Sequence, residues 1–407
     1  MSEWKEYRLG EVAEIVGGGT PKTKVQEYWN GEIPWLTPKD LSNFSGRYIS
    51  NGDRNISKLG LKNSSAKILP KGTVLLSSRA PVGYLAIASN EITTNQGFRS
   101  LIPNSKSNSL FLYYLLKNNV EYLKSQATGT TFGELAGSTL KSLSFLFPPL
   151  PEQKAIASVL SSLDDKIDLL HRQNKTLEAI AETLFRQWFV EEAQDDWEVV
   201  PLGDIATIQN GYAFSSRNYV EHQIGHLEVF KMGHIEPGGG LRYSPKSDFV
   251  PRTENLKRWI LTEGDIVMAM TDMKDSMGIL GHVAIIDKSD TYVLNQRVAR
   301  IYLVNDESLI NNHFLYLQLK TDVAIAIIQS KAHGGVQVNL STEAIKSTPI
   351  IIPPRKEQEK GFNLLRDYLF KLQNNRKQIR TLENLRDTLL PKLMSGEVRV
   401  EYEESAK

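Results

Sequence analysis

One glycine-rich stretch has the outline of a phosphate-binding loop. Residues 17–23 read GGGTPKT, and many proteins cradle a phosphate with a glycine-rich loop that leads into a lysine. Such a loop needs glycine immediately before the lysine so that the backbone can wrap the phosphate, but here Pro21 stands before Lys22. We therefore expect no nucleotide site at this position.

Histidine and cysteine offer no metal site. His222 and His226 have the spacing of the ligands on a zinc-protease helix, but Gln223 stands where the catalytic glutamate is needed and Gly225 favours a loop. Cysteine is absent, which excludes disulfides, thiolate metal sites and a cysteine nucleophile. Six of the seven histidines are scattered through one part of the chain, as His222, His226, His234, His282, His313 and His333. The sequence therefore predicts no metal ligands.

The motifs of DNA-modifying enzymes are also missing from the sequence. An adenine methyltransferase needs a glycine-rich cofactor loop and an Asn/Asp-Pro-Pro-aromatic element, whereas both diprolines of this chain, in FPPL and IPPR, follow hydrophobic residues. The acidic pair Asp164-Asp165 falls on a predicted helix and is interpreted as solvated surface. We therefore expect a protein that binds and positions other molecules, with no catalytic residue and no cofactor of its own.

Several loops combine glycine with hydroxyl, amide and basic side chains, as DNA-binding loops do. Arginine and lysine suit phosphates and guanine edges, and glutamine and asparagine suit adenine edges. Each loop alone could be an ordinary polar turn, but such loops recur at matching places in two halves of the chain. The candidate DNA-binding residues are Thr20, Lys22, Lys39, Arg79, Gln96, Arg99, Thr130, Tyr212, Arg217, Lys231, Lys274, Arg297, His333 and Gln337.

Composition predicts a soluble protein of more than one domain, since the chain has 407 residues, of which 41% are hydrophobic and 23% charged. No apolar run approaches the roughly 18 residues of a membrane span, and the first residues do not resemble a signal peptide, so a cytoplasmic protein is expected. Residues 39–99 hold nine basic side chains against three acidic ones, which fits either a nucleic-acid surface or an ordinary solvated one. Residues 197–352 hold 14 basic against 17 acidic side chains, net −3, so this half should depend more on neutral donors or on basic surface supplied by a partner.

The chain consists of two copies of one unit. WKEYRLGEVAEIVGG from Trp4 aligns with WEVVPLGDIATIQNG from Trp197, NQGFRSL from Asn95 with NQRVARI from Asn295, FLYYLLK from Phe111 with FLYLQLK from Phe314, and FPPLPEQK with IPPRKEQE. Four matches in the same order indicate an internal duplication rather than chance.

Each copy begins with a domain of mixed structure, over residues 1–147 and 197–352. Runs such as 72–78, 84–88, 264–270 and 282–286 are apolar or alternating and are bounded by turn residues, which predicts strands. One helix late in each domain is predicted over residues 111–124 and 314–330. The diproline then ends the domain, because proline cannot continue a strand ladder. The predicted fold class is α+β.

A long helix follows each domain, over residues 148–192 and 353–398, and residues 399–407 form a tail. Apolar residues recur at alternating steps of four and three, which is typical of a coiled-coil seam, and an asparagine in each seam would fix the register. The two helices should pair antiparallel because a domain lies between them; the alternative is that each packs on its own domain. The predicted interface residues are Leu160, Leu163, Ile167, Leu170, Asn174, Leu177, Leu184, Trp188, Leu365, Tyr368, Leu372, Asn375, Ile379, Leu382, Leu389 and Leu393.

The sequence resembles the specificity (S) subunits of type I restriction–modification systems over nearly its whole length. The resemblance is carried by LGEVAEIVGGGTP from Leu9, NQGF from Asn95, PPLPEQKAIASVLSSLDDKIDLLHRQNKTLEAIAETLFRQWF from Pro148, and PPRKEQE and LENLRDTLLPKLMSGEV in the second copy. It implies that the two domains are target-recognition domains, each reading one half of a split, asymmetric double-stranded DNA site. It also implies that the helices form a coiled coil with pseudo-twofold symmetry, which spaces the domains and docks two adenine-methyltransferase (M) subunits.

In such systems the M subunits use S-adenosylmethionine, and restriction–translocase (R) subunits join with ATP and Mg²⁺. The resemblance therefore implies that this chain catalyses nothing itself. It supplies no base-reading motif, so the candidate DNA-binding residues rest on loop chemistry alone. Two other functions stay open: a coiled-coil scaffold whose repeated domains bind protein partners, and an autonomous DNA enzyme that would bind S-adenosylmethionine unaided.

Overall fold

The computed structural model describes residues 4–42, 44, 46–128, 133–242, 245–303 and 310–401. The chain forms two compact units. Unit 1 comprises Met1–Leu169 and Arg380–Lys407, and unit 2 comprises Leu170–Ile379. Each unit therefore contains one globular domain together with one half of each long helix. The domain boundaries predicted from the sequence kept each helix whole and did not include this division.

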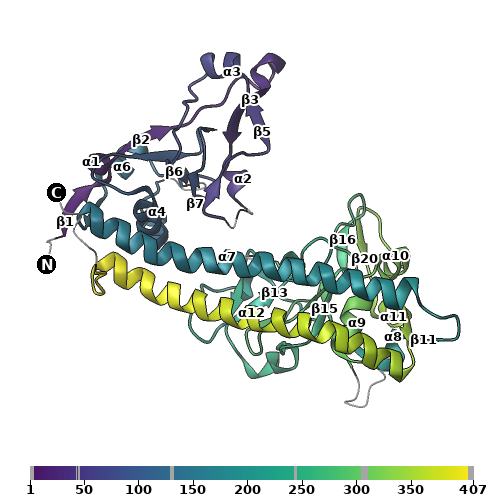
Figure 1. Cartoon of the computed structure of the whole chain (residues 1–407). Helices are drawn as coiled ribbons and strands as arrows, with labels where there is room; N and C mark the ends of the chain where they lie inside the picture. The colour runs from purple at the N-terminus through teal and green to yellow at the C-terminus, as the bar shows by residue number, and fades with distance from the viewer. Residues whose placement is uncertain are drawn as a thin grey trace. The chain divides into compact units, whose positions relative to one another are not determined.

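The globular part of unit 1 contains one five-stranded sheet, one three-stranded sheet and a separate terminal strand pair (Figure 1). The larger sheet has the order β2 (Ala13–Gly17), β9 (Arg99–Pro103), β6 (Val74–Ser78), β7 (Val82–Ala88) and β4 (Tyr48–Ile49). The smaller sheet has the order β5 (Arg54–Ile56), β3 (Trp29–Leu36) and β8 (Thr93–Thr94), and β1 (Lys5–Arg8) pairs with β10 (Ser144–Phe147). The strands predicted over 72–78 and 84–88 are thus confirmed as β6 and β7.

Unit 2 repeats this arrangement. Its larger sheet has the order β12 (Ala206–Asn210), β19 (Val298–Leu303), β15 (Ile266–Ala269) and β17 (Val283–Ile285), and its smaller sheet β14 (Phe249–Val250), β13 (Leu227–Phe230) and β18 (Tyr292–Leu294). The pair β11 (Glu198–Pro201) and β21 (Pro349–Ile352) matches β1 and β10. Unit 2 adds a strand pair, β16 (Thr271–Met273) with β20 (Gln337–Asn339). The predicted duplication and the α+β fold class are confirmed.

Short helices connect these strands. They are α1 (Leu9–Val12), α2 (Pro38–Ser42), α3 (Lys58–Lys62) and α6 (Gly137–Ser142) in unit 1, α8 (Leu202–Ile205) and α11 (Thr342–Lys346) in unit 2, and the 3-10 turns η1 (Gln26–Tyr28), η3 (Ser216–Asn218), η4 (Met232–His234) and η5 (Glu254–Trp259).

The prediction of one helix late in each domain is wrong in one respect, because two consecutive helices occupy that stretch in each domain. In unit 1 these are α4 (Ser109–Asn118) and α5 (Val120–Ser125), and in unit 2 α9 (Asn312–Leu319) and α10 (Asp322–Ser330). Asn119 leaves helical geometry between the first two, and the Thr321 side chain caps the start of α10 by accepting from the backbone N–H of Ala324 at 3.3 Å. Asparagine and threonine favour such caps over helix interiors.

The long helices are α7 (Leu150–Arg186), which ends in one π turn, η2 (Gln187–Glu191), and α12 (Arg355–Ser395). Their halves pack together antiparallel in each unit. In unit 1, Ile156 and Leu160 share a core with Leu390 and Leu393. In unit 2, Ala181 and Phe185 share a core with Leu365. The predicted helix pairing is confirmed, and the alternative that each helix packs on its own domain alone is excluded.

The predicted interface side chains are all buried or half-buried. Those buried are Leu160, Ile167, Leu170, Asn174, Leu365, Leu372, Asn375, Ile379 and Leu393. Those half-buried are Leu163, Leu177, Leu184, Trp188, Tyr368, Leu382 and Leu389. The two asparagines meet, since Asn375 Nδ2 donates to Asn174 Oδ1 at 2.9 Å. A buried amide pair of this kind fixes register, because sliding either helix would leave an amide unsatisfied.

Candidate nucleic-acid interface

Several loops of unit 1 meet at one edge of its sheets. The end of β2 lies opposite the start of β9, with Gly17 paired to Arg99. The ends of β3 and β8 lie side by side, with Leu36 paired to Thr94. The end of β6 reaches the same place through a bridge between Ser77 and Phe98. We call this place the loop edge of unit 1, because the segments that leave these strands all emerge there.

The Asn-Gln dipeptide shared by both copies is the centre of each loop edge. Asn95 ties the edge together: its backbone N–H donates to Leu36 O at 2.8 Å, and its side chain accepts from the Gly97 N–H at 2.8 Å. Asn295 makes the same two hydrogen bonds in unit 2, to Phe230 O at 3.1 Å and from the Arg297 N–H at 3.2 Å. The asparagine is therefore structural in both copies. The glutamine that follows it is exposed to solvent in both copies.

Four predicted residues of unit 1 come together at its loop edge. The Thr20 hydroxyl donates to the side-chain oxygen of Gln96. Arg99 lies against the backbone of Gln96 at 3.4 Å and pairs with Glu134 at 2.9 Å, and Arg79 pairs with the same carboxylate at 3.5 Å. Glu134 was not predicted from the sequence, where nothing marks it as the residue that holds two arginines side by side.

The other predicted residues of unit 1 are more peripheral. Lys22 is exposed in the loop after β2. Lys39, on α2, is exposed and lies 4.0 Å from Asp53, a distance at which an exposed pair contributes little to stability. Thr130 lies outside the described residues.

In unit 2, Tyr212 and Arg297 are placed at the equivalent edge. The Tyr212 N–H donates to Leu294 O at 2.8 Å, and the Tyr212 carbonyl accepts from the Gln296 N–H at 2.9 Å. The Tyr212 ring packs against Phe214 and Trp259 with ring centres 4.8 and 5.0 Å apart. Gln296 is exposed beside them and was missed, although its match to Gln96 in the repeated Asn-Gln pair could have identified it.

Three further candidates lie on or beside the β16–β20 pair of unit 2. Lys274 follows β16 and its N–H donates to Val336 O at 3.0 Å, Gln337 begins β20, and His333 bridges to Asn339. Two apolar side chains are exposed at this pair, Met273 of β16 at 51% and Val336, directly before β20, at 77%. This mixture of apolar and amide side chains suits contact with thymine methyl groups and base edges.

Lys231 directly follows β13 and so lies at the loop edge of unit 2, but its side chain is held by other residues of the domain. Lys231 pairs with Asp248 at 2.5 Å and lies 4.1 Å from the centre of the Tyr219 ring. Burial alone would lower the pKa of Lys231, but hydrogen bonds to Asp248 and Tyr219 outweigh it and raise that pKa. The amine is thus charged but already neutralised by a carboxylate. Arg217 is exposed in η3.

The Pro-Pro-x-x-x-Gln element of each copy is a clip that holds the start of the long helix. Gln153 Nε2 donates to Pro148 O and to Lys106 O, both at 2.9 Å, and its Oε1 accepts from the Asn108 N–H at 2.9 Å. Gln358 Nε2 donates to Pro353 O at 2.8 Å in the second copy. The most specific motif of the sequence is therefore structural and fixes each domain to its helix.

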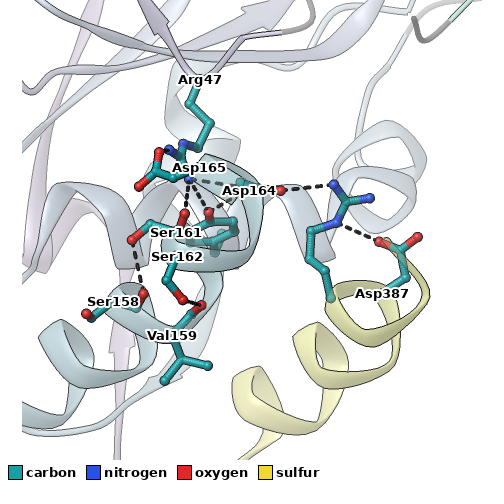
Figure 2. Close-up of polar contacts among 10 residues, drawn as sticks. Arg47, Ser158, Val159, Ser161, Ser162, Asp164, Asp165 and Asp387 are labelled. Carbon is teal, nitrogen blue, oxygen red and sulfur yellow. Dashed lines mark hydrogen bonds and ion pairs between the residues drawn. The ribbon is translucent and has the colours of Figure 1, made fainter. Parts of the chain in front are cut away.

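A buried charge network fixes the globular part of unit 1 to both long helices. Figure 2 shows Arg47, which is 7% exposed, reaching Asp165 and Asp164 on α7. The interpretation of Asp164 as solvated surface is wrong, because it is 6% exposed. Asp164 also accepts from the Tyr114 hydroxyl at 2.7 Å and pairs with Arg386 of α12 at 2.9 Å. Burial alone would raise the pKa of Asp164, but Lys117, Tyr114 and Arg386 outweigh it and hold that pKa below its ordinary value.

Unit 2 fastens its domain with different partners. Lys320, which follows α9, pairs with Glu182 of α7, and Arg376 of α12 pairs with Glu178 of α7 at 2.9 Å. Burial alone would lower the pKa of Lys320, but Tyr316 and Glu182 outweigh it and raise that pKa. Both domains are therefore held on the helix pair by buried ion pairs, which are costly to break one partner at a time.

No cluster of three or more histidine, cysteine, aspartate or glutamate side chains in the described part of the chain is arranged to hold a metal ion. The segment of residues 221–226, with His222 and His226, is a loop as predicted. Among the described helices none is long and apolar enough to cross a membrane.

Comparison with known proteins places this arrangement in a family. The family model described as "Type I restriction modification DNA specificity domain" matches residues 1–179 and 194–384. The MjaIX specificity subunit of Methanocaldococcus jannaschii is 37% identical over 98% of this chain and 94% of its own length, and the HindI specificity subunit of Haemophilus influenzae is 24% identical over 98% of this chain and its entire length. The crystal structure of the type I S subunit from M. genitalium shares the fold, with a TM-score of 0.50 and 18% identity over 100% of this chain and 97% of its own. The chain belongs to the specificity-subunit family of type I restriction–modification systems.

Proposed function

We propose that this specificity subunit reads a bipartite, asymmetric double-stranded DNA site, with one loop edge on each half-site. The observation that carries the proposal is the pair of equivalent loop edges, which are built on one strand order and centred on Asn95-Gln96 and Asn295-Gln296. A common frame with different side chains at its exposed end suits two readings of different base sequences. Exposed glutamines and arginines supply the donors and acceptors that base edges require.

Phosphate contacts would differ between the two half-sites. Around the loop edge of unit 1, Arg79 and Arg99 share the single carboxylate of Glu134, so two positive charges face one negative charge. Residues 197–352, by contrast, carry a net charge of about −3 from 14 basic and 17 acidic side chains. Unit 2 would therefore rely more on neutral donors, or on basic surface from a bound partner, to approach the DNA backbone.

The long helices would dock two copies of an adenine-methyltransferase subunit. Two apolar side chains support this, Ile180 of α7 at 36% exposure and Leu385 of α12 at 44%. Each lies three residues beyond the leucine of a matching Leu-Glu pair, Leu177 and Leu382. Equivalent exposed apolar positions on the two helices suit two copies of one partner. Restriction–translocase subunits would join the same complex.

We further propose that this chain is noncatalytic. S-adenosylmethionine, ATP and Mg²⁺ would be bound by the partner subunits, and the specificity subunit would contribute sequence selection alone. Purified without partners, it should neither methylate nor cleave DNA. Methyl transfer from labelled S-adenosylmethionine by the chain alone would contradict this.

The direct test is to map methylated adenines on plasmid DNA from cells that express this chain with its methyltransferase subunit. We expect one bipartite motif with adenines methylated in both halves. Exchanging residues 1–147 for the corresponding domain of another specificity subunit should change one half of the motif and leave the other half unchanged. No methylation motif, or a change in both halves, would refute the assignment.

The spacing of the half-sites is proposed to follow helix length. Inserting seven residues into both α7 and α12 adds about 10 Å of helix, which corresponds to roughly three base pairs at about 3.4 Å each. The methylated motif should then keep both halves and gain about three base pairs of spacer. An unchanged spacer in a well-folded variant would show that the helices do not set it.

A further inference from the structure

The last described residues of the chain fill a site in unit 1 that contains a buried carboxylate. Glu152 is 0% exposed, and Arg399 binds both of its oxygens, through Nε at 2.5 Å and Nη2 at 2.8 Å. Trp4 Nε1 also donates to Glu152 at 3.4 Å, and the guanidinium lies 5.5 Å from the Trp4 ring centre. The N-terminal strand and the end of α12 lie side by side here (Figure 1). Carboxylate and indole together form an arginine-binding site.

Unit 2 repeats this site without the arginine. Trp197 matches Trp4 at the start of the second copy, and Glu357 matches Glu152 in the Pro-Pro-x-x-Glu-Gln element. The residue that matches Arg399 is found by counting from the Leu-Glu pair shared by the two long helices. Arg399 lies 17 residues after Leu382, and the residue 17 after Leu177 is Gln194. Glutamine is shorter and uncharged, so it cannot replace the guanidinium.

A cavity of about 460 Å³ lies at this place in unit 2. Three aromatic side chains line it, Trp188, Phe189 and Trp197, together with the carboxylates of Glu192, Asp196 and Glu357. Lys360 also lines the cavity and lies 3.8 Å from Glu357. This ion pair is a single long contact, and the Glu357 carboxylate is half-exposed, so Lys360 binds it weakly. A guanidinium that bonds both carboxylate oxygens and stacks on an indole would compete with it effectively.

We propose that this cavity binds the arginine side chain of an extended segment from a partner protein, in the way that unit 1 binds Arg399. The segment Val398-Arg399-Val400 is the template, since both valines pack against the core of unit 1 while the arginine reaches Glu152. The partner segment would accordingly carry arginine between small apolar residues. Its guanidinium would pair with Glu357 and lie on Trp197. This interaction goes beyond DNA reading and does not depend on it.

The test uses the full chain and a labelled peptide with the sequence of residues 396–401, Gly-Glu-Val-Arg-Val-Glu. Binding is followed by fluorescence polarisation. We expect saturable binding that falls at least tenfold when the peptide arginine is replaced by citrulline, which keeps the shape but loses the charge. Glu357→Gln in the protein should cause a similar loss, and Gln194→Arg should block binding by filling the cavity from within.

Controls separate this site from the one in unit 1. Glu359→Gln removes an exposed carboxylate of the same helix that pairs with Arg355 and does not line the cavity, so it should leave peptide affinity unchanged. Hydrogen exchange verifies that each variant is folded. Equal binding of the citrulline peptide, or binding that survives both Glu357→Gln and Gln194→Arg, would overturn the proposal. The latter result would indicate that the peptide displaces the chain's own Arg399.

Discussion

The two units share a strand order, but different side chains join the strands, and the difference is clear at the two loop edges. At the loop edge of unit 1, Arg79 directly follows β6 and Glu134 directly precedes Leu135. These two residues form an ion pair, which joins the two segments. At the same place in unit 2, the neutral pair Thr271 and Asn339 forms a hydrogen bond of 2.9 Å. The same backbone frame therefore holds a charged pair in one unit and a neutral pair in the other, which suits the two different readings proposed above.

The contrast extends to the attachment of each domain to the helices. Unit 1 uses Arg47 and Asp164, whereas the residue of α12 at the position equivalent to Asp164, 14 residues after the start of its helix, is Leu369. Unit 2 instead relies on Lys320 with Glu182. The ion pairs that attach the domain to the helices thus occupy different positions in the two units. A substitution that breaks such a pair in one unit should therefore leave the stability of the other unit unchanged. The predictions below use this asymmetry.

The largest effect is expected from giving unit 1 the leucine of unit 2. Asp164→Leu should lower the free energy of unfolding of unit 1 by about 3 kcal/mol, because it leaves two buried arginines without their shared carboxylate. Arg47 keeps Asp165 and Arg386 keeps Asp387, which places the loss at the lower end of the usual range. Hydrogen exchange resolved along the chain measures it. Equal loss of protection in both units would contradict the assignment, and Asp367→Ala on the exposed face of α12 serves as the control.

Acidification should weaken unit 2 before unit 1. All seven histidines lie within residues 170–379, and burial lowers the pKa of His171 to about 4, and lowers those of His282 and His313. A histidine with a lowered folded pKa contributes stability that is complete above its ordinary value of about 6.5 and is lost as pH falls toward the folded value. Between pH 7.5 and 5, His171 alone should cost about 2 kcal/mol at 1.36 kcal/mol per pH unit.

Hydrogen exchange at the two pH values, corrected for the intrinsic rates, measures this difference between the units. His171→Gln removes the titrating group and should reduce the pH dependence of unit 2. If unit 1 lost as much protection as unit 2 over this range, buried histidine would not be the cause.

The exposed glutamines should separate the two DNA half-sites. Gln96→Ala should relax base preference at one position of one half-site, and Gln296→Ala at one position of the other, each by about 1–2 kcal/mol, or roughly tenfold. Selection from a randomised DNA library with the assembled complex provides the measurement. Loss of binding without a change in preference would indicate a backbone contact, and relaxation of both halves by one variant would break the correspondence between units and half-sites.

The smallest effect on stability is expected from exchanging the paired residues of the two loop edges. The double variant Arg79→Thr with Glu134→Asn gives unit 1 the neutral pair of unit 2 and should change the free energy of unfolding by less than about 1 kcal/mol, because both side chains of the charged pair are 37% exposed. Because the backbone positions are equivalent, base preference should change at the half-site of unit 1 alone. Thermal unfolding and the same library selection report the two results separately. A large loss of stability would mean that the frame of unit 1 depends on its charged pair.

Much of the fold could be predicted from the sequence, because it depends on patterns that repeat. The duplicated motifs gave the two copies, the alternating runs gave β6, β7, β15 and β17, and the heptad seam gave the helix pair with Asn174 opposite Asn375. The division of each long helix between two units was not predicted. It depends on which domain each half contacts, and periodicity reports one face of a helix without identifying its neighbour.

The candidate DNA-binding residues were harder to select. Residue type marked Arg79 and Arg99 but could not reveal that both face Glu134, since that carboxylate is far away in sequence and carries no motif. Lys231 was chosen for its charge, yet Asp248 neutralises it. Gln296 was overlooked although the repeated dipeptide contains it. The loop sequences thus indicate which residue types could bind DNA. Which of these side chains are already held in ion pairs within the protein depends on the folded structure.

The discontinuity of unit 1 has a consequence for synthesis on the ribosome. Leu390, Leu393 and Met394 complete the same core as Leu9 and Ile156, so the first part of the chain to be made lacks part of its core until nearly the last residues emerge. Unit 2 is one uninterrupted stretch, residues 170–379, and has all its partners earlier. Domains usually mature in the order of their translation, but here the second domain is finished first. The N-terminal domain should therefore expose part of its apolar core until this segment of α12 has been made.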